Sequence, residues 1–227
     1  DFGLTMLWMV LPVTIILVLY QEMSGRMGAV TGKGLSDLIR ENFGIRIAFY
    51  LLLGKFLAGI ANTTAEFGGI AASMELFRVN KYIAVPIMAL LIWLLTIKAS
   101  YRKLEKIFLI GTLFFGCYIV SGLISPVDWS EVGRQIVTPS FPMHDSRYLM
   151  LLVALIGTTI APWMVFYQQS AVVEKGIKIS EYKYFRWEAP FVGLSVGVVI
   201  FFIILTSSPL YHSNQTITTA KEAALAL

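Results

Sequence analysis

The fifth of six long apolar segments carries residues whose types and spacing could hold a cation inside a membrane. The stretch Gly157-Thr158-Thr159-Ile160-Ala161-Pro162 stands at its middle. Proline lacks an N–H and clashes with the preceding helical turn, so with glycine just upstream the pattern predicts an unwound break. In lipid, freed carbonyls are tolerated only where protein buries them or where they line a polar cavity. Two interpretations stay open: carbonyls that coordinate a cation, as in the broken helices of secondary transporters, or an ordinary proline kink.

A polar stripe runs along the second apolar segment. Its members are four, three, four, three and four residues apart and share one helical face: Lys55, Gly59, Asn62, Glu66, Gly69 and Ser73. Lys55 and Glu66 are about 16 Å apart along the axis at 1.5 Å per residue, too far for an ion pair. An intramembrane carboxylate such as Glu66 indicates ion conduction, proton transfer or a structural bond to a neighbouring helix. The glycines and Ser73 fit a close-packing seam equally well.

Two glutamines, Gln168 and Gln169, follow the proline by about two helical turns. On the Gln168 face an amide could reach a cavity at the break, although an interhelical hydrogen bond is the role that we favour for the pair. Enzyme motifs are missing: the chain has no HExxH, GxSxG, GxGxxG or P-loop pattern. We place both histidines, His144 and His212, in outer loops, so we expect none within a membrane-crossing segment. We therefore expect no enzyme.

The composition places these segments in a membrane. Hydrophobic residues make up 57% of the 227 residues and charged residues 14%, against about 25% charged in a typical soluble domain. The net charge of +4 is spread in small groups, which argues against a nucleic-acid binder. The single cysteine, Cys117, excludes an internal disulfide framework and a thiolate metal cage. The sequence predicts an all-α integral membrane protein, with one transmembrane domain over residues 1–227.

Six segments are long enough to cross about 30 Å of hydrocarbon. We place them near residues 3–22, 47–74, 82–98, 107–125, 148–174 and 187–207. A short surface helix is expected near 129–136 in the polar loop 126–147. The chain starts within an apolar run and ends soon after a polar loop, so we expect it to be a piece of a larger protein.

Basic residues alternate between the connections and predict the topology. The first, third and fifth connections hold four Lys or Arg each, whereas the second and fourth hold two each. Cytoplasmic loops carry the excess of Lys and Arg. We therefore expect a multi-pass protein of the cell (plasma) membrane, with the residue 1 end and the C-terminal loop outside.

Three stretches together resemble the natural resistance-associated macrophage protein (NRAMP) family of divalent-metal transporters. The stretch QEMSGRMGAVTGKGL, from Gln21 to Leu35, is similar to the second helix of the family and the turn after it. The stretch NTTAEFGG, from Asn62 to Gly69, is similar to the third helix, whose pattern carries Asp, two residues, then Glu. The stretch Gly157 to Trp163 is similar in position to the broken sixth helix with its Met-Pro-His motif.

The resemblance implies a LeuT-like (APC-type) fold of inverted repeats, of which this chain covers about six transmembrane helices, helices two to seven of the family. The first helix, with the metal motif Asp-Pro-Gly-Asn, and the later helices would then lie outside the chain. Asp1 does not match that motif, because phenylalanine and glycine follow it. Half of the expected metal site is therefore absent from this sequence. The resemblance leaves the oligomeric state unknown.

Four departures from the family pattern resemble the NRAMP-related magnesium transporters, a branch that moves Mg²⁺ and Mn²⁺. The metal-binding methionine falls on Ala161, the two histidines on Trp163 and Gln168, and the aspartate of the third helix on Thr63, while Glu66 is kept. A thioether is a soft ligand that favours transition metals, whereas Mg²⁺ takes oxygen ligands and keeps its waters. Ala161 removes that soft ligand and leaves volume for water.

The resemblance implies a metal site at the Thr158 carbonyl and Ala161. The cavity or pathway would be lined by Gly157, Thr159, Pro162, Trp163, Gln168, Asn62, Thr63 and Glu66. The partners would be divalent metal ions and the lipid bilayer, with Mg²⁺ and Mn²⁺ as transported ions and no resident cofactor.

We expect a transporter or facilitator that is not strictly coupled to protons, because Thr63, Trp163 and Gln168 do not titrate near neutral pH. The alternatives are a proton-coupled Mn²⁺/Fe²⁺ transporter, an amino-acid transporter of the same fold, and a membrane scaffold with a degenerate site.

Overall fold

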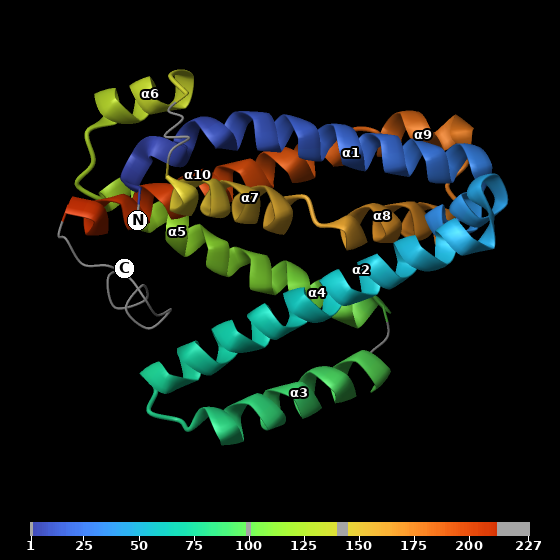
Figure 1. Cartoon of the computed structure of the whole chain (residues 1–227), viewed down its shortest axis with the longest axis horizontal. Helices are drawn as coiled ribbons and strands as arrows, with labels where there is room; N and C mark the ends of the chain where they lie inside the picture. The colour runs from blue at the N-terminus through green and yellow to red at the C-terminus, as the bar shows by residue number, and fades with distance from the viewer. Residues whose placement is uncertain (1, 99–100, 140–144, 213–227) are drawn as a thin grey trace. The chain divides into compact units, whose positions relative to one another are not determined.

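The computed structural model describes residues 2–98, 101–139 and 145–212, and these residues form helices joined by short turns (Figure 1). The expected C-terminal loop lies outside the described residues. The chain divides into two compact units. One comprises Thr5–Ile60 and Ser130–Ile200, and the other comprises Asp1–Leu4, Ala61–Trp129 and Phe201–Leu227. Each unit is described by itself below.

Within the described residues, six helical stretches are long and apolar enough to cross a membrane. They are Gly3–Thr31, Leu35–Leu76, Lys81–Lys98, Lys106–Ile124, Ser146–Glu174 and Ile179–Ser208. Only helices satisfy every backbone group within a single membrane-crossing segment. The predicted all-α architecture with about six spans is therefore confirmed.

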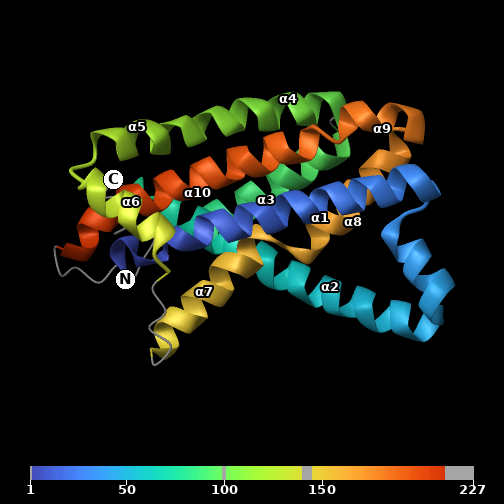
Figure 2. The same ribbon diagram turned by 90° about the horizontal axis from the view of Figure 1, so that it is seen from above.

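The larger unit is built around α1 (Val10–Thr31), which a 3-10 turn, η1 (Gly3–Met9), precedes. The buried side of α1 repeats at helical spacing through Val10, Val13 and Leu17. Helix α8 (Pro162–Glu174) lies beside α1, and α7 (Ser146–Thr159) and α9 (Ile179–Phe185) also touch it (Figures 1 and 2). This packing fixes α8, the helix that follows the predicted break.

Two glycines let α10 (Glu188–His212) approach α1 closely. A Cβ atom at Gly193 would collide with Val18, and one at Gly197 would collide with Thr14. Small residues four apart allow this kind of contact between membrane helices, because backbones can then come together.

The second apolar stretch begins earlier than the sequence predicted. Helix α2 (Leu35–Leu76) contains a non-helical residue, Gly44, with φ +81° and ψ 167°. This backbone conformation is almost confined to glycine. Gly44 therefore separates a short helix, 35–43, from the membrane-length helix that follows, which explains why the apolar pattern starts near residue 47.

The surface helix expected near 129–136 is confirmed as α6 (Trp129–Val137). Val132 is buried, and Arg134 lies 2.7 Å from the Glu131 carboxylate one turn earlier. Hydrogen bonding to Glu131, together with its charge, raises the pKa of the Arg134 guanidinium. The pair is exposed, so it contributes little to stability.

The smaller unit holds α3 (Lys81–Lys98), α4 (Tyr101–Thr112) and α5 (Gly116–Ile124), the last two joined by a 3-10 turn, η2 (Leu113–Phe115). Gly122 of α5 lies against the Phe202 ring of α10, where a Cβ atom would come 2.6 Å from the ring. The second part of α2 completes this unit and carries Asn62, Thr63 and Glu66.

Candidate functional site

The fifth membrane-length stretch is broken in the middle, as the sequence predicted for one helix. Helix α7 ends at Thr159 and α8 begins at Pro162 (Figure 1). Between them, Ile160 has φ −112° and ψ 64°, and Ala161 has φ −71° and ψ 137°. The chain thus leaves the helix for two residues before it resumes.

The break is shorter than the stretch 157–162 that we expected. Gly157, Thr158 and Thr159 stay helical, and both threonine hydroxyls donate to carbonyls of the preceding turn. The Thr158 bond to Ala154 is 2.9 Å long and the Thr159 bond to Leu155 is 2.8 Å long. Proline pushes only the residue before it out of the helical region, and it is well suited to the first position of a new helix.

The carbonyls at the end of α7 lack helical partners, and Pro162 ensures this for Thr158. In a continuous helix the carbonyl of Thr158 would accept from the N–H four residues later, at position 162. Proline has no N–H, so this bond cannot form. The end of α7 also carries the negative end of its helix dipole. The Thr158 carbonyl therefore lies at the negative end of the α7 dipole without a helical N–H partner.

The side chains around the break differ in burial. Ala161 is buried with 6% of its surface exposed, and Thr159 is buried with 9% exposed. Gly157, Thr158 and Pro162 are exposed, and Trp163 is 44% exposed. The position on which the methionine of the resembled family falls thus holds a small buried methyl group, and the indole of Trp163 nearby is partly exposed.

The polar stripe of α2 divides into two separate interactions. In the smaller unit, Asn62 Nδ2 donates a 2.7 Å hydrogen bond to Glu66 Oε1. In the larger unit, Lys55 Nζ lies 4.4 Å from the centre of the Phe166 ring on α8. Thr63 and Glu66 are exposed on α2. No feature of the sequence identified Phe166 as the partner of Lys55, because the two residues are far apart along the chain.

The glutamine pair does not make the interhelical hydrogen bond that we favoured: Gln169 bonds instead to the turn that follows α1. This side chain is 0% exposed, and its Nε2 donates to the Lys33 carbonyl over 2.8 Å. Gln168, the residue predicted to line the cavity, is half-buried. A hydrogen bond between α1 and α8 themselves joins Ser24 Oγ to the Val165 carbonyl at 2.7 Å. Sequence reasoning identified Gln169 and missed Ser24 and Lys33 as its neighbours.

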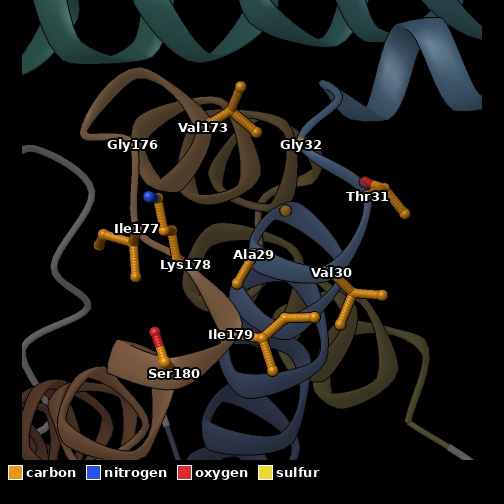
Figure 3. A pocket seen from close by; sticks show the side chains of 11 residues that line it. Ala29, Val30, Thr31, Gly32, Val173, Gly176, Ile177, Lys178, Ile179 and Ser180 are labelled. Carbon is orange, nitrogen blue, oxygen red and sulfur yellow. The ribbon is translucent and has the colours of Figure 1, made fainter.

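A pocket of about 600 Å³ lies at the turn between α8 and α9 (Figure 3). The end of α1 forms one wall, and Lys178, Ser180 and Thr31 are its side chains with nitrogen or oxygen atoms. The pocket contains none of the predicted site residues. Across the described part of the chain, no three His, Cys, Asp or Glu side chains gather as a metal cluster.

Comparisons with known proteins identify the family. The family model described as natural resistance-associated macrophage protein-like matches residues 1–227, the whole chain. A protein named divalent metal cation transporter MntH from Granulibacter bethesdensis is 31% identical over 170 residues. The match covers 73% of this chain and 38% of that protein. A protein of the same name from Burkholderia ambifaria is 33% identical over 171 residues, with the same coverage of 73% and 38%.

The matched region therefore spans well under half the length of these relatives. The match agrees with the all-α membrane architecture of the described residues. Since the family model covers every residue, the chain belongs to the natural resistance-associated macrophage protein-like family.

Proposed function

We propose that this chain is part of a transporter of divalent metal cations that accepts Mg²⁺ as well as Mn²⁺. The observation that carries the proposal is the break between α7 and α8, where Pro162 leaves the Thr158 carbonyl without a helical partner. The relatives named as divalent metal cation transporters support the general class of substrate. Transport would make the protein a carrier of ions rather than an enzyme.

The chemistry at position 161 supports acceptance of Mg²⁺. The Ala161 side chain provides no donor atom, so the ligands that this segment offers are oxygens and bound waters. Mg²⁺ takes oxygen ligands and releases its waters reluctantly, whereas a thioether would favour softer metals. A small side chain beside a carbonyl suits a partly hydrated ion.

The helix dipoles favour a cation over an amino acid on the α7 side of the break. The C-terminal end of α7 presents carbonyls and partial negative charge, which attract a cation. The N-terminal end of α8 would attract a carboxylate instead. An amino-acid transporter remains the alternative that the α8 end supports. The metal-binding motif of the first family helix would supply the remaining ligands from outside this chain.

We further propose that the protein is a multi-pass protein of the plasma membrane. The connections rich in Lys and Arg would face the cytoplasm, and the residue 1 end and the C-terminal loop would face outside. The alternation of basic residues between the membrane-length stretches supports this orientation. Labelling of single cysteines on either side of the membrane tests it.

Ion uptake into liposomes tests the proposed function. The full-length protein is reconstituted with a fluorescent metal-sensitive dye inside, and Mn²⁺ influx is measured with and without excess Mg²⁺. We expect influx above empty-liposome controls, and inhibition by Mg²⁺ because both ions use the same oxygen site. Influx that a large excess of Mg²⁺ leaves unchanged would contradict Mg²⁺ acceptance. Uptake of amino acids without metal uptake would favour the alternative.

A further inference from the structure

Gln169 has a fully buried side chain in which only one of the two polar atoms, Nε2, has a hydrogen-bond partner among the described residues. Its exposed fraction is 0%, and its Nε2 donates to the Lys33 carbonyl at 2.8 Å. Among the described groups none donates to Gln169 Oε1. Burying an amide oxygen without a partner is unfavourable, because the oxygen loses its hydration. The bond from Nε2 is therefore the contact that favours glutamine here.

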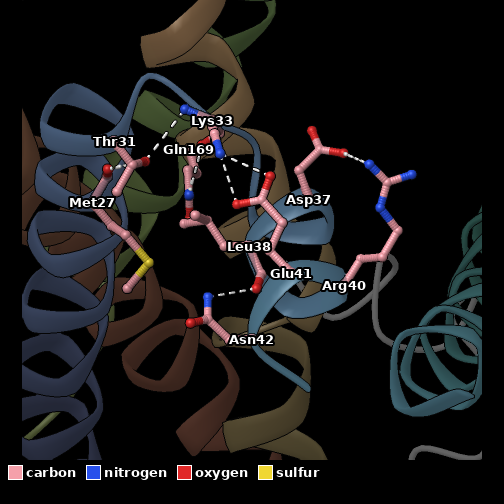
Figure 4. Close-up of polar contacts among 9 residues, drawn as sticks. All are labelled: Met27, Thr31, Lys33, Asp37, Leu38, Arg40, Glu41, Asn42 and Gln169. Carbon is pink, nitrogen blue, oxygen red and sulfur yellow. Dashed lines mark hydrogen bonds and ion pairs between the residues drawn. The ribbon is translucent and has the colours of Figure 1, made fainter. Parts of the chain in front are cut away.

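The acceptor of this bond lies in residues 32–44, which connect α1 to the membrane-length part of α2 and are called the connection 32–44 below. Two glycines with positive φ mark its ends: Gly32 at +64° and Gly44 at +81°. Lys33 Nζ lies 2.7 Å from each carboxylate oxygen of Glu41, in the short helix 35–43 (Figure 4). Lys33 thus holds α8 through its backbone and the short helix through its side chain.

The contacts around Gln169 leave little room for α8 to move relative to α1. A Cβ atom on Gly28 would come 2.9 Å from the Gln169 carbonyl oxygen and 3.3 Å from Val172 Cβ. Ser24 Oγ holds the Val165 carbonyl one turn earlier. The backbone of α8 therefore packs closely against α1. The hydrogen bond from the Gln169 amide joins α8 to the connection 32–44 as well.

We infer that Gln169 is a positioning residue: its amide donor fixes the connection 32–44 to the half-helix α8, which has Ala161 at its N-terminal cap. The inference rests on the proposed function, in which the cation binds at the break. Gln169 lies eight residues beyond Ala161, about 12 Å along the helix axis. A rigid helix transmits its anchoring over that distance, so Gln169 acts on the site without touching the ion.

Three variants separate the donor bond from other roles of the side chain. Gln169→Met keeps length and apolar volume but removes the donor, which leaves the Lys33 carbonyl unpaired. Gln169→Glu keeps the shape, and its acid can donate to Lys33 only while it is protonated. Burial disfavours the carboxylate, so the protonated form is favoured at acidic pH. Ser170→Ala, at the exposed next position, is the matched control: its hydroxyl also faces the connection, 3.7 Å from where a Cβ atom on Gly34 would stand, but none of the described hydrogen bonds joins it to residues 32–44.

Hydrogen exchange of residues 32–44 in the full-length protein measures the anchoring directly. In Gln169→Met we expect exchange about tenfold faster than in the natural protein and in Ser170→Ala, each compared at the same pH. In Gln169→Glu we expect near-natural protection at about pH 5.5, where the buried acid is protonated and donates, and equal or lower protection at about pH 8.5 according to the fraction of the acid that ionises. Unchanged exchange in Gln169→Met would overturn the inference. So would Gln169→Glu exchanging like Gln169→Met at both pH values.

Mn²⁺ uptake into liposomes then tests the link to transport. We expect Gln169→Met to lower Vmax about tenfold, with KM for Mn²⁺ within about twofold, because no ligand of the ion changes. Faster exchange with an unchanged Vmax would overturn the positioning role. Absence of uptake by the natural protein would refute the proposed function instead, and the exchange result would still decide whether Gln169 anchors the connection.

Discussion

Ala161 is the residue on which the proposed acceptance of Mg²⁺ depends, because its methyl group occupies the position where the resemblance places a thioether. We expect Ala161→Met to lower Mg²⁺ transport and to shift the preference towards Mn²⁺ or Cd²⁺ by about tenfold, since sulfur favours softer ions. Dye-loaded liposomes measure the ratio of initial rates. Ala161→Leu is the control for size, because it fills similar volume without sulfur. Equal shifts in both variants would show that volume, and not the soft ligand, determines selectivity.

Lys55 and Phe166 form a second contact at the scale of single residues. The ammonium lies 4.4 Å from the ring centre, and such contacts contribute about 1–2 kcal/mol when partly desolvated. We expect Phe166→Leu to lower the thermal unfolding temperature of the purified protein, whereas Phe166→Trp should preserve it because indole binds cations better.

Phe191→Leu is the control for that experiment, since Phe191 is 74% exposed and no cation among the described residues lies over its ring. A loss of stability in Phe166→Trp as large as that in Phe166→Leu would indicate ordinary packing rather than a cation–π contact.

At the scale of elements, the close contact between α1 and α8 depends on Gly28. A Cβ atom there would come 2.9 Å from a backbone oxygen of α8, which cannot move aside as a side chain can. We expect Gly28→Ala to destabilise the protein by about 1–3 kcal/mol through overpacking. Thermal unfolding of the purified protein measures the loss.

Gly133→Ala on the surface helix α6 is the matched control, because its new methyl group meets no described atom within 4 Å. Alanine is the better helix former, so this variant should be neutral or slightly more stable. Equal behaviour of the two variants would contradict the close packing of α1 and α8.

At the scale of the whole molecule, we predict that metal entry is not strictly coupled to protons. A proton path needs a series of groups or waters that take up and release protons. Thr63, Trp163 and Gln168 do not titrate near neutral pH, and Glu66 is held by Asn62 within its own helix. One carboxylate without relay partners conducts protons poorly. A pH-sensitive dye inside liposomes should therefore show no acidification beyond controls during Mg²⁺ or Mn²⁺ uptake.

The contrary result would be acidification that depends on metal and disappears in Glu66→Gln. Asn62→Ala is a useful companion variant, because it frees the Glu66 carboxylate from its hydrogen bond without removing it. If Asn62→Ala alone produced acidification, the bond to Asn62 would be what suppresses proton transfer in the natural protein.

The sequence by itself determined the all-α membrane architecture, the number of membrane-length stretches and the presence of a break before Pro162. These features depend on local chemistry: apolar length decides whether a helix can span lipid, and proline removes one N–H wherever it stands. The surface helix α6 followed from the same kind of local pattern. The family predicted from the three resembling stretches is the family whose model matches the chain.

The tertiary structure alone decided how narrow the break is and which polar side chains meet. Thr158 and Thr159 stay helical with their hydroxyls bonded to the preceding turn, and only Ile160 and Ala161 leave the helix. Lys55 meets Phe166, and Gln169 meets the Lys33 carbonyl, across more than one hundred residues of chain. Helical periodicity shows which side chains share a face, but it carries no information on which helix packs against that face. Which helices pack together depends on the shapes of their surfaces and on how closely their backbones can approach, and neither follows from local sequence.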